Sequence, residues 1–165
     1  MSDPNFEIYQ NMSEHQHQVE LFAWAAYARR FGFTQANEWL QLHPQALSRK
    51  TKLGHAPVPI EEQPPLKWLH AIPNGGARGD SRQSAAIVGS RLKAEGVKAG
   101  VADIFLPYPN VATRSHGLYI ELKTLEGKPS TKQTEFLHDM VTTGYACEVC
   151  RGYLAAIETI KEYLK

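Results

Sequence analysis

The spacing of apolar and polar positions predicts helices in the first third of the chain. From Ser13 to Gly32, apolar side chains recur three or four positions apart, which is typical of an amphipathic helix that a glycine ends. A second, shorter helix is expected to run from a cap at Thr34 to Pro44. Residues 44–65 contain five prolines and a basic cluster, so we expect a long loop or a lid there.

The rest of the chain alternates between short apolar runs and helical periodicity. A polar stretch at 108–116 joins two predicted strands and suits an antiparallel hairpin with a long loop. The order of elements predicts an α/β fold in which a small mixed sheet is flanked by helices. We expect a single domain over 1–165, with helices and the loop in 1–65 and the core in 66–165. The predicted strands are residues 66–72, 101–106, 117–124 and 145–151, and the predicted helices are residues 80–95, 131–143 and 153–164.

Composition narrows the class of protein without deciding it. The chain has 165 residues, of which 42% are apolar and 21% charged, as in an ordinary globular domain. Its net charge of +1 argues against a strongly basic coat protein of nucleic acid. A nuclease stays open, because an acidic metal site offsets basic flanks. No apolar run approaches the length of a membrane span and no signal peptide opens the chain, so we expect no membrane partner and a cytoplasmic location, in a host cell if a phage encodes it.

Charged side chains interrupt two apolar strands of the predicted core. Glu121 and Lys123 stand two positions apart, so they share a face of their strand while their neighbours face the core. Burying charge is costly unless the charge is paired or binds a metal. Asp103 opens the strand that we expect to pair with this one, which brings two carboxylates together. A divalent cation such as Mg²⁺ or Mn²⁺ is their natural partner, and the carbonyl oxygen of Leu122 offers a further ligand.

This arrangement suits metal-assisted hydrolysis of a phosphodiester. The metal would activate a water and neutralise charge on phosphorus, and Lys123 would position the water and stabilise the transition state. The alternative is structural: Asp103 as an aspartate at a strand end, and Glu121 with Lys123 as a solvent-exposed ion pair on an edge strand.

The wider sequence resembles a known nuclease family. Asp103 followed by Glu121-Leu122-Lys123 is similar to the PD-(D/E)xK signature, and the ordered set resembles the VRR-NUC family of virus-type replication–repair nucleases. The resemblance implies a restriction-endonuclease-like core and metal-dependent DNA cleavage. Ala102 stands where the family usually has a proline, a backbone constraint rather than a ligand, so we expect activity to survive. The set comprises residues 73–78, 92–103, 117–123 and 130–133.

The resemblance also implies roles for residues outside the two strands. Gln133 matches a glutamine that faces the active site, with an exposed helix residue as the alternative. Glu14 with Gln18 resembles an N-terminal Glu-x-x-x-Gln element whose members share a helix face. Glu20 is the rival acidic residue, and a helix-capping acid is the alternative for Glu14. Stand-alone family members act on branched DNA such as four-way (Holliday) junctions, generally as dimers, so we expect DNA and a second copy as partners.

Several cations are candidates for contact with DNA phosphates. The glycine-rich residues 74–79 are not a Walker loop, since no Gly-Lys-Ser/Thr follows, and they form either a phosphate-contacting loop or a flexible turn. The site needs cations around it to hold the DNA backbone. The candidates are Arg78, Arg82, Arg91, Lys93 and Lys132.

Two alternatives to an enzyme remain at this point. One is a DNA-structure-binding module that keeps the fold without turnover. The other is a protein–protein adaptor that uses the proline-rich residues 56–65. His15 and His17, two apart on the first helix, are expected to be solvated.

Overall fold

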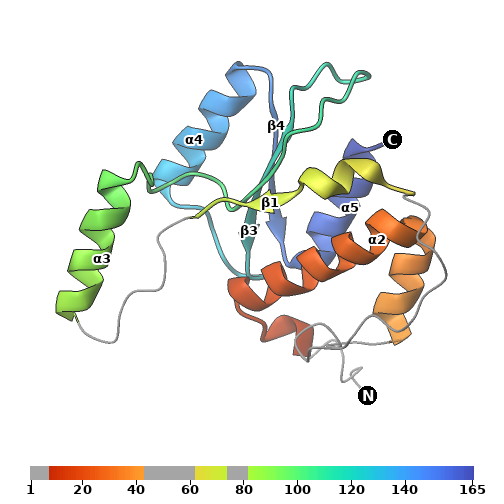
Figure 1. The fold of residues 1–165 in the computed structure, drawn as a ribbon, viewed down its shortest axis with the longest axis horizontal. Helices are drawn as coiled ribbons and strands as arrows, with labels where there is room; N and C mark the ends of the chain where they lie inside the picture. Colours follow the sequence, from red (N-terminus) through yellow and green to blue (C-terminus); the bar gives the residue numbers. More distant parts are fainter. Residues whose placement is uncertain (1–7, 43–61, 74–81) are drawn as a thin grey trace.

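A computed structural model of the chain describes residues 8–42, 62–73 and 82–165 (Figure 1). Within these ranges, four strands form one mixed sheet in the order β1-β2-β3-β4. The strands are β1 (His70–Ala71), β2 (Ile104–Leu106), β3 (Leu118–Lys123) and β4 (Ala146–Arg151). The α-helices are α2 (Glu14–Leu42), α3 (Arg82–Ala94), α4 (Thr131–Thr142) and α5 (Tyr153–Tyr163), and η1 (Pro64–Trp68) is a 3-10 helix.

Strand β3 lies in the interior of the sheet. It pairs antiparallel with β2, with Ile104 opposite Ile120, and this confirms the predicted hairpin. On its other side it pairs parallel with β4, with Glu121 opposite Val149. Strand β2 is shorter than expected and begins one residue after Asp103. The mixed sheet with flanking helices is the predicted fold class.

The two faces of the sheet are covered by different helices (Figure 1). Helices α2 and α5 pack on one face, where alternate residues of β2 and β3 meet them in a closed apolar core. Helix α4 covers the other face, and its Phe136 ring lies 5.2 Å from the ring of Tyr119 on β3. The largest contributors to the core include Leu21, Trp24, Ile104, Ile120, Leu122 and Ile160.

Helix α2 consists of two helical segments that meet at Gly32. This glycine has φ 82° and ψ 168°, which no helical residue adopts, so the predicted end of the first helix and start of the second are confirmed. The segments are held together by Trp24, whose indole N–H donates to the Asn37 side chain at 3.0 Å. The Trp24 ring also stacks on Phe33 at 5.7 Å.

The predicted strand over 66–72 is wrong for most of its length. Pro64 and Pro65 fix their own φ angles and lack amide protons, which suits the first turn of a helix, and the chain forms η1 there. Only His70–Ala71 pairs with β2. Leu66 and Leu69 are still buried, so the apolar pattern was a helical one.

Helix α3 matches the helix predicted over 80–95 but not its packing. Figure 1 shows it set apart from the sheet. Its Ile87, which the sequence pattern places on the apolar side, is 70% exposed. None of the described helices is both long and apolar enough to cross a membrane.

The different surroundings of two isoleucines test this arrangement. Ile160→Ala removes a fully buried side chain from the core and should lower the free energy of unfolding by about 2–5 kcal/mol. Ile87→Ala is the matched control on exposed α3 and should change it by no more than about 0.5 kcal/mol. Urea unfolding of both variants measures the difference. Equal losses would contradict the placement of the core.

Candidate active site

Asp103 is anchored at the junction of three strands. Its backbone carbonyl accepts a hydrogen bond from the amide of Ile72 at 2.8 Å, just after β1. Its carboxylate Oδ2 accepts one from the backbone amide of Leu122 at 2.9 Å. This second bond fixes the Asp103 carboxylate beside β3, next to the side chain of Glu121.

Glu121 and Lys123 form an ion pair inside the protein. Their side chains are 0% and 7% exposed, and Lys123 Nζ lies 2.6 Å from Glu121 Oε1. Because β3 is an interior strand, the alternative of an exposed pair on an edge strand is excluded. Burying two charges requires close contact and further hydrogen bonds to offset the loss of water.

Gln133 supplies one of those further hydrogen bonds. Ser130 caps α4 in a capping box, in which the Gln133 side-chain oxygen accepts from the Ser130 amide at 2.8 Å. This contact orients the Gln133 amide so that its NH₂ group donates a hydrogen bond to Glu121 Oε1. The start of α4 is thereby tied to the buried carboxylate.

Glu14 contributes a second carboxylate to Lys123 from the first turn of α2. Its Oε1 lies 3.2 Å from Lys123 Nζ, which also donates to the Leu122 carbonyl oxygen at 3.2 Å. Glu20, the rival acidic residue, is only 3% exposed and lies near Tyr153. The structure thus brings Glu14, rather than Glu20, to the ion pair.

Burial sets the charge states of the pair. The pKa of Glu121 is raised to about 7, chiefly by loss of water and also by the negative charge of Asp103, against the hydrogen bond from Lys123. For Lys123, burial lowers the pKa, but contacts with Glu121 and Glu14 outweigh burial and raise it overall. Lys123 is therefore a lasting positive charge at neutral pH and unsuited to accepting a proton.

The predicted DNA contacts are only partly gathered around this centre. Lys132 is exposed at the start of α4, one residue before Gln133, and its side chain packs closely on Gly100. Arg91 and Lys93 are exposed on α3, where Arg91 forms an ion pair with Glu95 at 2.8 Å. Arg78 and the side chain of Arg82 lie outside the described residues.

His17 is a residue near the site that the sequence analysis placed wrongly. It is fully buried rather than solvated, and its Nδ1 accepts a hydrogen bond from the Tyr153 amide at 3.4 Å. The signal was its spacing, because His17 lies four positions before Leu21 on the buried face of α2. Glu14 lies one turn earlier on the same helix.

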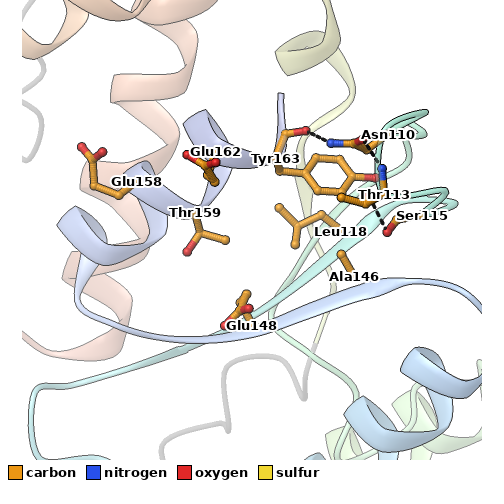
Figure 2. Close-up of a pocket in the computed structure, with 10 residues that line it drawn as sticks. All are labelled: Asn110, Thr113, Ser115, Leu118, Ala146, Glu148, Glu158, Thr159, Glu162 and Tyr163. Carbon is orange, nitrogen blue, oxygen red and sulfur yellow. Dashed lines mark hydrogen bonds between the residues drawn. The ribbon is translucent and has the colours of Figure 1, made fainter. Parts of the chain in front are cut away.

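A hollow of about 580 Å³ lies at the opposite end of the sheet (Figure 2). Its walls include Leu118 and Ala146, the first residues of β3 and β4, so it is roughly 16 Å along the strand from Lys123. Glu148, Glu158 and Glu162 line it, and their carboxylates would repel DNA phosphates. This hollow is therefore separate from the charged centre and unsuited to the DNA backbone.

Comparison with known proteins identifies the family. The family model described as the VRR-NUC domain matches residues 62–154, which is more than half of the chain. The chain belongs to this family of nuclease-type domains that process DNA. Among solved structures, it is similar to a "VRR_NUC domain protein" at 20% identity, with a TM-score of 0.56 over 92% of this chain and 88% of that one, a likeness of fold. A comparison with curated proteins gives no match.

The raised pKa of Glu121 predicts a dependence of stability on pH. Between its ordinary value of 4.5 and about 7, the folded protein holds a proton on Glu121 that the unfolded chain has lost, so stability falls as pH rises through this window. Glu121→Gln removes the effect. In metal-free buffer, its stability relative to the wild type should therefore rise between pH 5 and 8, by at most about 3 kcal/mol.

Thermal and urea unfolding of both proteins measure this difference, in which titrating groups that do not interact with Glu121 cancel. A stability difference that stays constant from pH 5 to 8 would show that Glu121 titrates normally.

Proposed function

We propose that this chain is a metal-dependent endonuclease that hydrolyses phosphodiester bonds in DNA. The observation that carries the proposal is the buried carboxylate of Glu121, held between the Asp103 carboxylate and the Lys123 ammonium group. An ion pair buried in an interior strand costs free energy that packing alone would not recover. A nuclease site would explain why the chain keeps this buried ion pair. Membership of the VRR-NUC family supports the same explanation.

The residues present fit a divalent metal with oxygen ligands. Glu121 Oε2 is buried and has no hydrogen-bond partner among the described residues. Across all the described residues, no group of three or more His, Cys, Asp or Glu side chains is arranged to hold a metal ion. We propose that Asp103, Glu121 and the Leu122 carbonyl oxygen hold Mg²⁺ or Mn²⁺, which accept few protein carboxylates and leave room for water and phosphate. When bound, the metal makes a water more acidic and offsets charge on the phosphate.

Lys123 serves in this proposal as a fixed positive charge. Its ammonium group has hydrogen-bonding contacts with Glu14, Glu121 and the Leu122 carbonyl, so its position is set before substrate arrives. A preorganised cation stabilises negative charge as it develops on phosphate oxygens, without a reorganisation cost. To orient the attacking water, the ammonium group would exchange one of these three contacts for it, because it has only three N–H donors.

Gln133 and Glu14 hold this centre from two different helices. Gln133 orients the Glu121 carboxylate from α4, and Glu14 draws Lys123 toward α2. We propose that both act in catalysis by keeping the carboxylate and ammonium groups in place for the phosphate. Exposed Lys132, beside Gln133, would contact the DNA backbone, with Lys93 and Arg91 of α3 as further contacts.

The natural substrate is proposed to be branched DNA, and four-way junctions above all. This follows from the resemblance to stand-alone VRR-NUC proteins. We also propose that the chain acts as a homodimer, because a four-way junction presents two symmetric strands and two-fold assemblies are common.

Charge removal at Lys123 tests the mechanism. Lys123→Met and Glu121→Gln should each lower the rate of cleavage by about 10²–10³-fold, as loss of a preorganised transition-state contact does. Lys161→Met is the matched control, because Lys161 also pairs with a glutamate, Glu158 at 2.8 Å, but belongs to α5. Labelled linear, splayed and four-way-junction DNA would be incubated with Mg²⁺, Mn²⁺ or EDTA.

The result expected is cleavage that needs metal, favours the junction, and survives only in the wild type and Lys161→Met. Cleavage that persists at full rate in Lys123→Met would overturn the mechanism. Junction binding without cleavage of any substrate would point instead to a DNA-structure-binding module.

Metal binding has a test that needs no activity. Mn²⁺ at about a hundredfold excess over its Kd should stabilise the wild type by about 2.7 kcal/mol, seen as a rise in Tm. Asp103→Asn should lose most of this rise, and Asp139→Asn on exposed α4 should keep it. An equal rise in all three proteins would mean that Asp103 does not bind the metal.

A further inference from the structure

The corner between β4 and α5 is tied to the candidate active site through the backbone. Gly152 forms the corner with φ 80°, and its amide donates to the Lys123 carbonyl oxygen at 2.8 Å. Tyr153 then begins α5, and no side chain within the corner caps the free amides of this helix. The Tyr153 amide instead has its hydrogen-bond partner in another part of the chain.

Two side chains from the N-terminal part of the chain close this corner. The Tyr9 hydroxyl donates to the Arg151 carbonyl oxygen at 3.2 Å, and its ring lies so close over Gly152 that a Cβ there would overlap it. His17 Nδ1 accepts from the Tyr153 amide at 3.4 Å, which caps α5 from another helix. The Tyr9, His17 and Tyr153 rings pack together with centroids 5.2–5.8 Å apart.

His17 can cap the helix only in its neutral form. An acceptor Nδ1 places the ring proton on Nε2, which is buried and has no hydrogen-bond partner among the described residues. Burial lowers the pKa of His17, against the nearby negative charge of Glu14. The ring is thus held neutral at the N-terminus of α5, where a positive charge would be unfavourable.

His17 and Glu14 lie one turn apart on α2, and both lead to Lys123. Glu14 contacts the Lys123 side chain at 3.2 Å. His17 reaches the Lys123 backbone through Tyr153 and Gly152. The first turn of α2 therefore contacts the Lys123 ammonium group directly, and it is linked to the Lys123 backbone through the β4–α5 corner.

We propose that His17 is a positioning residue that locks the first turn of α2 onto the β4–α5 corner, so that Glu14 holds the Lys123 ammonium group in its catalytic place. The catalytic meaning of that place rests on the proposed function. The contacts between His17, Glu14 and Lys123 do not, and they can be tested without DNA.

The experiment compares three variants of the full chain. His17→Leu keeps much of the volume but removes the acceptor, and His17→Asn restores an oxygen at the position of Nδ1. His15→Leu, on the exposed face of the same turn, is the matched control. The readout is the rate at which an amine-reactive ester acylates Lys123, relative to exposed Lys128, measured by peptide mass spectrometry.

We expect His17→Leu to speed acylation of Lys123 at least fivefold, with His17→Asn and His15→Leu within twofold of the wild type. Acylation at the wild-type rate in His17→Leu, or equally fast in His17→Asn, would overturn the proposal. Should His17→Leu lose its cooperative thermal transition, His17→Gln replaces it, because its acceptor lies one bond too far, and the same outcomes apply.

Cleavage kinetics separate this proposal from the proposed function. His17→Leu should lower kcat tenfold or more with little change in KM, but no more than twofold when Glu14 is already Gln. A full effect of His17→Leu in the Glu14→Gln background would overturn the route through Glu14. A wild type that cleaves no DNA would defeat the proposed function, while the acylation rates would still decide the role of His17.

Discussion

The burial of one ion pair in the middle of the sheet constrains the rest of this structure. Glu121 and Lys123 lie on the interior strand β3, where both side chains are almost fully buried. Such a pair needs further hydrogen-bond partners to offset the loss of water. The start of α4 must therefore bring Gln133, and the start of α2 must bring Glu14. Three elements distant in sequence converge at one end of one strand for an electrostatic reason.

The same strand separates apolar packing from charge along its length. On the α4 face, Tyr119 stacks on Phe105 at 4.3 Å and meets Phe136, so the first part of this face is aromatic. Only the end of that face, at Glu121 and Lys123, carries charge. The low dielectric of the surrounding side chains strengthens each contact at the ion pair. Apolar packing along β3 thus provides the low-dielectric surroundings in which the ion pair at the end of the strand is strongest.

Local sequence patterns predicted much of this fold and only part of its site. Periodicity gave the helices, the hairpin and the break at Gly32, since these depend on neighbouring residues. Alternation along one strand and pairing with its neighbour predicted that Asp103, Glu121 and Lys123 lie close together, because both depend on residues near one another in the sequence. The contact of Glu14 with Lys123 spans 109 positions, so it could be expected only from the family resemblance. The burial of His17 was missed although its spacing from Leu21 indicated it, and its partner, an amide of α5, could not be inferred from spacing on α2.

The segment that matches the family model begins at residue 62, after α2 has ended, and stops two residues into α5. Those two helices nevertheless supply much of the apolar core on one face of the sheet. A fragment limited to the matched residues would expose Ile104, Ile120 and Leu122 to water and would leave Lys123 without Glu14. The segment that matches the family model is therefore not an independent folding unit. Any fusion or chimera has to include α2 and the whole of α5 as well.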